Sequence, residues 1–434
     1  MGPEDGLPQR FADEMGRLAG PDFPKEMILA VSGGGDSMAM LYLAAPWAHV
    51  MGIKLHVCTV NHNLRAEAPE EAALVARACA ELGLYHQVLD WQWDGQGNLQ
   101  DAGRQGRLDL INRWRGAVAH VLMAHTRDDQ AETFLMRLAR GSGLDGLSGM
   151  AAVREVRLKD DFVPLAAHPD GPPWPSVLPG AFEVLRPLLS TTREELRHYL
   201  RVLKIDHADD PTNDDPHYDR VKMRQALPAL AELGLTVDRL AGTAEHLAGA
   251  REAAHARAFE AHASCLIDDP GRGLFDITYD RDAFAKIERD TQMRLLAAAL
   301  QYVSLEPYRP RRSALENALE RALAGGATTL HGGYVYPHKS KLFICAEYER
   351  LKDLNSENGK WRGLYRTDNN DVRPLGEAGA AQLRDKTDLP ARVLWPVPGV
   401  WDGKTVLSTP RLGENPHWNP EIDARRFARL LTSR

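Results

Sequence analysis

The feature that most constrains this chain is a glycine-rich hexapeptide between two apolar runs. Residues 27–31 read MILAV, residues 38–43 read MAMLYL, and between them residues 32–37 read SGGGDS. This order predicts a buried strand that turns sharply into a buried helix. Because glycine has no Cβ, the backbone can approach a ligand closely, and the loop N–H groups with the positive end of the helix suit a phosphate. We therefore predict a phosphate-binding loop rather than a plain tight turn. The candidate contacts are Ser32, Gly33, Gly34, Gly35 and Ser37.

The acid near the end of this loop sets it apart from an ordinary P-loop. A P-loop ends in Gly-Lys-Ser or Gly-Lys-Thr, and its lysine pairs with phosphate. Here the corresponding residues are Gly35, Asp36 and Ser37. A carboxylate cannot pair with phosphate directly, but it can hold the Mg²⁺ that does. The expected ligands are therefore ATP and Mg²⁺, with Asp36 as the metal ligand.

Length and composition narrow the class of protein. A chain of 434 residues is too long for one core, so two or three domains are expected. Residues 1–6 are acidic and lack the apolar segment of a signal peptide. No apolar stretch approaches the ~20 residues that a membrane helix needs. We therefore expect a cytoplasmic protein that makes no membrane contact.

Charge and cysteine content exclude two further classes. The formal net charge of −7 argues against a protein that binds nucleic acid over its whole surface, so any RNA contact needs local basic patches. The four cysteines, at positions 58, 79, 265 and 345, contain no C-x-x-C pair. Neither a zinc site nor a disulfide framework is indicated, and reduced thiols are expected.

The first half of the chain alternates short β-like runs with helical ones. The predicted strands are 27–31, 55–60, 86–91 and 119–124, and the predicted helices between them are 38–45, 70–82 and 100–113. This alternation predicts an α/β fold, with a parallel sheet covered by helices on both faces. Ligands of such folds bind beyond the carboxyl ends of the strands. Polar residues follow three of these strands, at 32–37, 61–65 and 125–129, so they are expected to face one crevice.

Two acids open the helix that follows the fourth strand. Asp129 and Glu132 are three residues apart and so lie on one helix face. Thr126 and Asp129 also have the spacing of a capping box, and acids are common at helix N-termini. The spacing alone leaves capping and function open. The position at the crevice favours a function, in which the two carboxylates seat a cationic substrate or a second metal ion.

The second half of the chain gives weaker signals. Residues 162–180 contain six prolines and predict a surface loop, residues 227–257 predict a helical segment, and 354–360 predict a linker. A further helix at 311–324 and β-like runs at 334–337 and 341–345 lie between the last two. Local charge marks Arg309, Arg311, Arg312, Lys339 and Lys341 as candidate RNA contacts.

Taken together, these segments resemble a known family. The loop at residues 32–37 is similar to the PP-loop of ATP pyrophosphatases, which split ATP between the α- and β-phosphates. Within that group the chain resembles the tRNA(Ile)-lysidine synthetases, over about its first 225 residues. The further matching segments are 60–65, 102–107, 125–133, 140–150 with 185–189, and 210–213 with 220–224. In the last segment Arg220 and Arg224 match the family pattern, but Val221 stands where the family has asparagine.

The resemblance implies a two-step reaction on an isoleucine tRNA with a CAU anticodon. O2 of the wobble cytidine attacks the α-phosphate of ATP and releases pyrophosphate, and then the ε-amine of free L-lysine attacks C2 and releases AMP. Asp129 and Glu132 would recognise the lysine, and one of them could take its proton. Arg104, with one or both of Arg220 and Arg224, would stabilise the α-phosphate or hold the flipped cytidine. His62 and His125 would join the nucleotide-binding residues, with His125 orienting its neighbours.

The resemblance also suggests a division of the chain. Residues 1–220 would form the ATP-binding catalytic domain, 221–350 a mostly helical tRNA-recognition domain and 361–434 a small α+β domain. The sequence leaves a homodimer open. Two alternatives also stay open at this point: a tRNA thiolase of the same fold, which would need paired cysteines, and a PP-loop protein that binds tRNA without catalysis.

Overall fold

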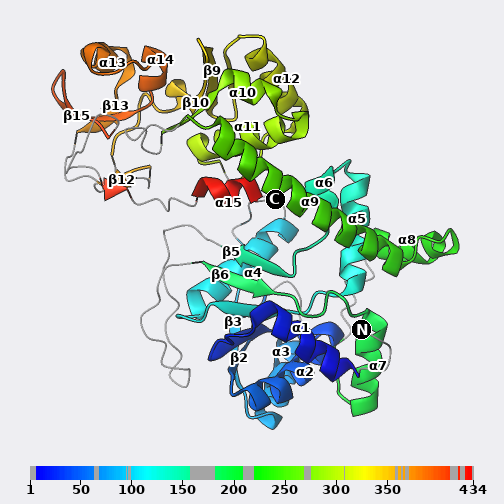
Figure 1. Ribbon diagram of the computed structural model, residues 1–434. Coiled ribbons are helices and arrows are strands. Elements are labelled where there is room, and N and C mark those ends of the chain that lie inside the picture. The colour runs from blue at the N-terminus through cyan, green and yellow to red at the C-terminus, as the bar shows by residue number, and fades with distance from the viewer. Residues whose placement is uncertain are drawn as a thin grey trace. The chain divides into compact units, whose positions relative to one another are not determined.

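The chain folds into two compact units, Met1–Gly249 and Ala250–Arg434 (Figure 1). The computed structural model describes residues 6–62, 68–93, 95, 99–156, 181–208, 219–267, 275–306, 308–356, 360–362, 365–366, 371–410, 419–420 and 426–432. The predicted loop at 162–180, Arg65 and the segment 210–213 lie outside these residues. None of the helices in the described ranges has the length and apolar character needed to cross a membrane.

The first unit is built on a six-stranded sheet with the strand order β3-β2-β1-β4-β6-β5. The strands are β1 (Glu26–Ala30), β2 (Lys54–Asn61), β3 (Tyr85–Asp90), β4 (His120–Met123), β5 (Val153–Val156) and β6 (Phe182–Leu185). All neighbours pair in parallel except β5, which is antiparallel to β6. The four predicted strands are present within one or two residues, and the mostly parallel sheet is confirmed.

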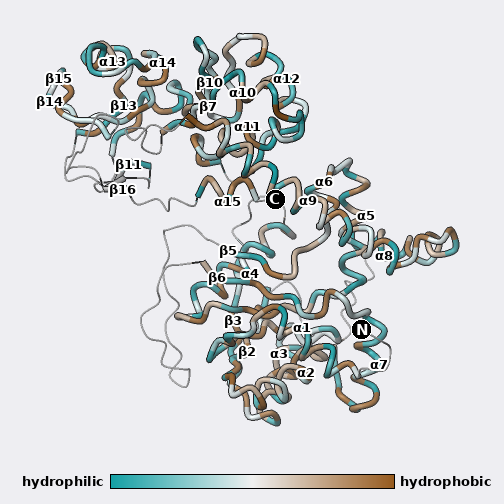
Figure 2. The backbone as a smooth tube through the Cα atoms, in the orientation of Figure 1, coloured by the Kyte–Doolittle hydropathy of each residue, from teal (hydrophilic) through white to brown (hydrophobic). Residues whose placement is uncertain are grey.

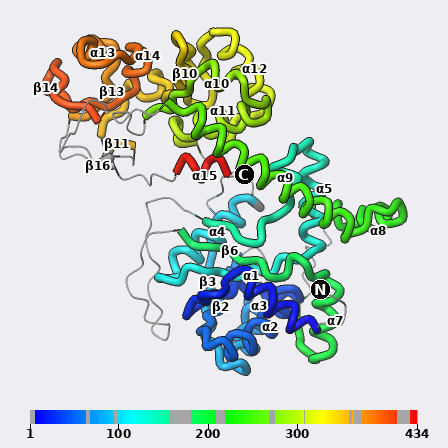
Figure 3. The backbone as a smooth tube through the Cα atoms, viewed as in Figure 1, coloured from blue at the N-terminus to red at the C-terminus, as the bar shows by residue number. Residues whose placement is uncertain are grey.

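Helices cover both faces of this sheet, as predicted. On one face lie α1 (Leu7–Ala19), α2 (Gly35–Met51), α3 (Ala68–Glu81) and α7 (Arg193–Leu203), which share a core with the odd-numbered side chains of β1. On the other face α4 (Leu99–Trp114) packs Ile111 and Trp114 against Ile28. Figure 2 shows the same arrangement by hydropathy, with apolar residues along the strands and hydrophilic ones at the turns. Figure 3 shows that α7 lies beside α2, although the two helices are far apart in the chain.

The first unit extends beyond the predicted boundary at residue 220. The helices α5 (Arg127–Ala139), α6 (Leu144–Leu147) and α8 (Asp219–Glu232), with the part of α9 (Val237–Cys265) up to Gly249, complete this part of the fold. Phe134 of α5 packs with Leu227 of α8 and Leu240 of α9 in a small core of its own. Because this core ties α8 and the start of α9 to α5, the compact unit continues to Gly249.

The second unit contains more strands than the predicted, mostly helical segment 221–350 implies. Its four-stranded antiparallel sheet has the order β7 (Asp276–Asp280), β10 (Lys341–Ala346), β9 (Gly333–His338), β8 (Thr328–Leu330). Its helices are α10 (Arg281–Lys286), α11 (Arg289–Ser304), α12 (Arg312–Leu323) and α15 (Arg426–Thr432). The side chains of α11 are buried from Thr291 to Val303, so this helix forms the centre of the unit's core.

The rest of the second unit forms a smaller core around Trp361 and Trp401. It contains a three-stranded sheet of β13 (Val372–Pro374), β14 (Pro398–Asp402) and β15 (Thr405–Ser408), with α13 (Gly376–Gln382) and α14 (Ala391–Leu394). The short strands β11 (Lys360–Trp361), β12 (Tyr365–Arg366) and β16 (Asn419–Pro420) form another sheet. These small sheets agree with the predicted α+β character of the C-terminal part. Arg309, a candidate RNA contact, donates to the carbonyls of Leu430 and Leu431 at the end of α15.

Candidate active site

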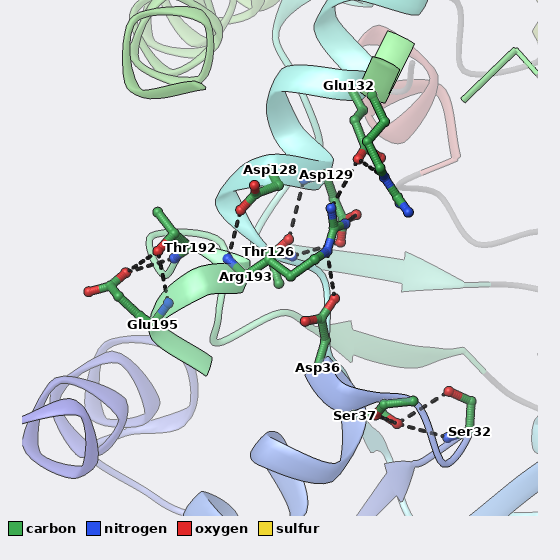
Figure 4. Close-up of polar contacts among 12 residues, drawn as sticks. Ser32, Asp36, Ser37, Thr126, Asp128, Asp129, Glu132, Thr192, Arg193 and Glu195 are labelled. Carbon is green, nitrogen blue, oxygen red and sulfur yellow. Dashed lines mark hydrogen bonds and ion pairs between the residues drawn. The ribbon is translucent and has the colours of Figure 1, made fainter. Parts of the chain in front are cut away.

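The glycine loop joins β1 to α2 and is held by its two serines (Figure 4). The Ser32 N–H donates to Ser37 Oγ at 3.1 Å, the two hydroxyl oxygens lie 3.2 Å apart, and Ser37 Oγ donates to the Gly34 carbonyl at 2.9 Å. Gly33 has φ +91°, a left-handed conformation that favours glycine. The helix begins at Gly35, so the loop ends on the positive pole of a 17-residue helix, where an anion is stabilised.

Asp36 lies in the first turn of α2 and points away from the serines toward α5 and α7 (Figure 4). One of its carboxylate oxygens, Oδ2, accepts from Arg193 Nε at 3.2 Å. Burial raises the pKa of this carboxyl above its ordinary value, and Arg193 opposes that rise. The other oxygen, Oδ1, has no hydrogen-bond partner among the residues that the structure describes and remains available to a cation.

Asp129 and Glu132 lie on the first turns of α5, as predicted, and the capping interaction is also present. The Asp129 N–H donates to Thr126 Oγ1 at 3.3 Å, and Asp129 Oδ2 accepts from the Thr126 N–H at 2.8 Å. The second oxygen of Asp129 and both oxygens of Glu132 face three arginines. Capping and charge pairing are therefore combined in Asp129, so the two interpretations of the sequence do not exclude each other.

Two sets of charged side chains, from α2, α5, α7 and α8, meet in this site. The acid cluster is Asp36, Asp129 and Glu132, and the arginine cluster is Arg193, Arg220 and Arg224. Arg193 contacts all three acids, at 3.2 Å, 2.8 Å and 3.2 Å respectively. Arg220 contacts Asp129 and Glu132, each at 2.7 Å, and Arg224 contacts Glu132 at 2.9 Å. The sequence pointed to Arg220 and Arg224 but not to Arg193.

Arg193 is held by the start of α7. Thr192 caps that helix in a capping box with Glu195, and the Arg193 N–H donates to Asp128 at 2.7 Å. The signal that could have found it is the sequence Thr-x-x-Glu at 192–195, which marks a helix start with an arginine at its first position. A helix start gives no hint, however, of which distant acids that arginine meets.

The charges of the cluster shift the pKa values of its members. Burial disfavours the ionised form of Asp129, but Arg220 and Arg193 outweigh it and hold the pKa of this carboxyl below its usual range. The same attraction works in reverse on Arg193, whose pKa is raised by the acids in spite of its burial. Asp129 is therefore an anion at neutral pH and a poor acceptor of protons.

His125 and His62 border the site at the ends of β4 and β2. Arg186 Nε donates to His125 Nδ1 at 3.2 Å, and burial, with the charge of Arg186, lowers the pKa of His125 to about 3. A histidine of this kind stays neutral and orients its neighbours rather than exchanging protons at neutral pH. The ring of His62 meets that of Trp91 edge to face, with centroids 5.3 Å apart.

One cavity of about 1300 Å³ brings these groups together. All of the predicted site residues line it except Gly33, which lies behind the loop, and Glu132, which is fully buried. Further arginines border the cavity, namely Arg104 and Arg107 of α4 and Arg197 and Arg201 of α7. Burial and the nearby Arg220 lower the pKa of Arg104, and burial and Arg104 lower that of Arg107. The α4 side of the cavity is thus cationic and suits a phosphate.

A metal ion at this site would need ligands from the substrate as well as from the protein. Across the described part of the chain no three His, Cys, Asp or Glu side chains are grouped so that they could hold an ion. A single carboxylate, Asp36, fits Mg²⁺, because this ion takes one or two carboxylates and fills its remaining positions with phosphate oxygens and water. The residues present are therefore compatible with a magnesium–nucleotide complex.

The cysteines do not form a sulfur-transfer site. None of the four is in a disulfide and all are buried, and burial raises the pKa values of Cys58 and Cys79 to about 12. A thiol of this kind is rarely ionised and is a poor nucleophile. The thiolase alternative, which depends on paired reactive cysteines, therefore finds no support in these side chains.

Comparison with known proteins agrees with this geometry. The family model of the PP-loop domain matches residues 7–230, about half of the chain. The tRNA(Ile)-lysidine synthase of Ruegeria pomeroyi is 36% identical over 92% of this chain and 92% of its own length. Relatives of the same name from Bradyrhizobium diazoefficiens and Wolbachia pipientis wMel are 38% and 30% identical over 69% and 76% of this chain, and over 80% and 73% of their own. The chain belongs to the PP-loop family of tRNA(Ile)-lysidine synthases.

Proposed function

We propose that this protein ligates L-lysine to C2 of the wobble cytidine in an isoleucine tRNA with a CAU anticodon. ATP is split to AMP and pyrophosphate, and an adenylated cytidine is the intermediate. The names of the relatives support the tRNA and the product. The cavity supports the chemistry, because it joins a phosphate-binding loop to the carboxylate of Asp129, behind which Glu132 is buried.

The observation that carries this proposal is the position of Arg193. Its guanidinium contacts Asp36, next to the glycine loop, and also Asp129 and Glu132 on α5. The loop that would hold the triphosphate and the acids that would hold the amine are therefore only one side chain apart. A reaction between an adenylated base and an amine needs its two reactants at this kind of separation.

The glycine loop serves the first step. Its backbone N–H groups and the start of α2 stabilise the charge that develops on the pyrophosphate leaving group. Magnesium held by Asp36 Oδ1 would neutralise part of the same charge. Arg104 and Arg107 form no ion pair with any residue in the described part of the chain, and we assign them to the phosphate or the flipped cytidine.

The acids of α5 serve the second step. Asp129 remains an anion because Arg220 and Arg193 lower its pKa, and an anion attracts the ammonium of lysine. For the same reason it is a weak proton acceptor, so we assign it to recognition rather than to general base catalysis. Glu132, one helical turn further on, would complete the recognition site.

One incubation tests this function directly. The full chain, ATP, Mg²⁺, labelled L-lysine and a CAU-anticodon isoleucine tRNA are combined, and the nucleosides are analysed after digestion. We expect label in a lysidine nucleoside and release of pyrophosphate that depends on the tRNA. The same tRNA with uridine at the wobble position is the control and should give neither. Labelled lysine that stays entirely free while ATP is consumed would rule out the ligation.

Two variants separate the two steps. Asp36→Asn should abolish tRNA-dependent pyrophosphate release, because the magnesium ligand is lost. Glu132→Gln keeps the side-chain shape and should mainly raise the KM for lysine, by about tenfold or more for one lost charged contact. Asp109→Asn, at a half-exposed acid of α4 that does not line the cavity, is the control. Equal loss of pyrophosphate release in the Asp36 and Glu132 variants would contradict the role of Glu132.

A further inference from the structure

Glu132 is closed off from the cavity by arginine side chains. Its side chain is 0% exposed, and it does not line the cavity although Asp129 does. Glu132 Oε1 accepts from Arg193 at 3.2 Å and Arg224 at 2.9 Å, and Oε2 accepts from Arg220 at 2.7 Å. An incoming ammonium therefore meets guanidinium groups before it meets this carboxylate.

Asp129 is engaged in the same way. Its Oδ1 accepts from Arg193 at 2.8 Å and from Arg220 at 2.7 Å, and its Oδ2 accepts from the Thr126 N–H. Every oxygen of the two proposed lysine-binding acids thus has a donor within the protein. A lysine ammonium, which brings three donors of its own, can bind here only if a guanidinium gives up its place.

The balance of charge leads to the same requirement. The acid cluster carries three negative charges and the arginine cluster three positive ones, so the group is neutral as it stands. A lysine ammonium added to it would leave one unpaired positive charge in a largely buried place, which is costly. An arginine that moves to a new anion removes this cost.

The phosphates of the nucleotide are the anions that can accept such an arginine. All three members of the arginine cluster line the cavity into which the glycine loop opens. Guanidinium binds phosphate through two parallel hydrogen bonds, as well as it binds a carboxylate. Arg224 is the member that exchanges most readily. Among the described residues Arg224 has one ion pair and a side chain that is 31% exposed. Arg220 has two ion pairs and is 30% exposed, and Arg193 has three and is 16% exposed.

We propose that the nucleotide opens the lysine site by drawing Arg224 from Glu132 to a phosphate. Lysine then binds after ATP, in the place that the guanidinium has left, and free lysine does not occupy the site beforehand. This inference rests on the proposed function and adds to it an order of binding and a residue that sets the order. By linkage, lysine must strengthen nucleotide binding by the same factor by which the nucleotide strengthens lysine binding.

Calorimetric titration of the full chain measures this coupling. Lysine is titrated into the protein alone and into the protein with Mg²⁺ and saturating α,β-methylene-ATP, which cannot release pyrophosphate. We expect the analogue to tighten lysine binding about tenfold or more, within the range usual for coupled sites. The reciprocal titration should give the same factor. Equal lysine affinity with and without the analogue would overturn the exchange.

A variant of Arg224 distinguishes exchange from a structural role. Arg224→Gln leaves the clustered charges with one net negative charge, so lysine should bind without the nucleotide and the coupling factor should fall toward one. An arginine with only a structural role would predict weaker lysine binding in both titrations, which would count against the proposal. Arg224→Lys keeps the charge without the paired donors, so it should retain part of the coupling if the Gln variant proves unstable. Arg113→Gln, at a partly exposed arginine of α4 that does not line the cavity, should keep the full factor.

The lysidine assay separates this inference from the function on which it rests. If the protein forms lysidine but binds lysine equally well with and without the analogue, the exchange is wrong and the function stands. If no lysidine forms, the function is wrong and the exchange with it.

Discussion

The local sequence around Arg193 does not predict which acids this residue contacts. Arg193 sits at the first position of α7 and meets Asp36, which is 157 positions away in the chain. The glycine loop, Asp36 and the acids of α5 could be predicted, because each has a local pattern of glycines, charges and spacing. The partner of each acid could not, because it depends on how β4, α5 and α7 pack, and no local pattern encodes that.

A second contact at the residue scale, between His86 and Thr59, supports the strand end that leads into the glycine loop. His86 Nε2 lies 2.8 Å from Thr59 Oγ1, and Thr59 donates to the carbonyl of Val31, the residue before the loop. Burial lowers the pKa of His86 to about 4. In the unfolded chain a histidine titrates near a pKa of ~6.5, so the unfolded state binds a proton that the folded state resists.

This contact predicts a pH dependence of stability. The contribution of neutral His86 to the free energy of unfolding is complete above about pH 6.5 and is lost progressively as the pH falls toward about 4. His86→Gln cannot titrate, so the difference in urea midpoint between wild type and variant should shrink across this window. Urea unfolding at several pH values from 8 to about 4 measures it. A difference that stays constant with pH would contradict the assignment.

At the scale of elements, strands with long apolar runs were predictable and short paired strands were not. The central residues of β1 and β2 are buried, three of five and five of eight, so their apolar composition marks them. β5 reads Val-Arg-Glu-Val with three of its four residues exposed, and it becomes a strand by pairing with β6. The predicted helix at 227–257 is divided into α8 and α9. Gly234, between the two helices, adopts φ +84°, which ends the first helix.

The glycine loop gives an element-scale prediction with an internal control. Gly33 and Gly52 both have left-handed φ, at the start and end of α2. A Cβ on Gly33 would lie 3.2 Å from the Glu71 carbonyl oxygen, whereas a Cβ on Gly52 would meet nothing within 4 Å. Each Gly→Ala variant should lower the free energy of unfolding by about 1 kcal/mol through backbone strain. Only Gly33→Ala should also raise the KM for ATP, because only there must the loop shift.

Urea unfolding and initial rates of pyrophosphate release check both variants. We expect the two variants to lose similar amounts of stability. Only Gly33→Ala should also change the KM for ATP. Unchanged ATP kinetics in Gly33→Ala would show that the loop tolerates the added methyl group without moving.

At the scale of the whole molecule, the described site residues all belong to the unit Met1–Gly249. The hydrophobic clusters follow the same division. The largest cluster of the first unit extends from Phe11 to Leu200, and that of the second begins at Ala258. The predicted division at 220 and 350 came from the family resemblance, which does not reveal that α8 packs on α5. The role of residues 221–350 in tRNA recognition stays a prediction.

Separate cores predict separate unfolding transitions. Differential scanning calorimetry of the full chain should show two transitions. α,β-Methylene-ATP with Mg²⁺ should raise the midpoint temperature of only one of them, that of the unit Met1–Gly249. When the analogue is present at about a hundred times its Kd, this midpoint temperature should rise by about 5–10 °C for a unit of this size. Gly33→Ala should reduce the shift. A single transition that moves as a whole would mean that the two units unfold together.

The burial of the cysteines has a practical consequence. Because Cys58, Cys79, Cys265 and Cys345 are all shielded, maleimide dyes should leave the native protein unlabelled. One cysteine introduced on the surface would then carry a fluorophore at a single known place, with no native thiol to remove first. Movements of the tRNA on this enzyme could be followed by energy transfer in an otherwise unaltered chain.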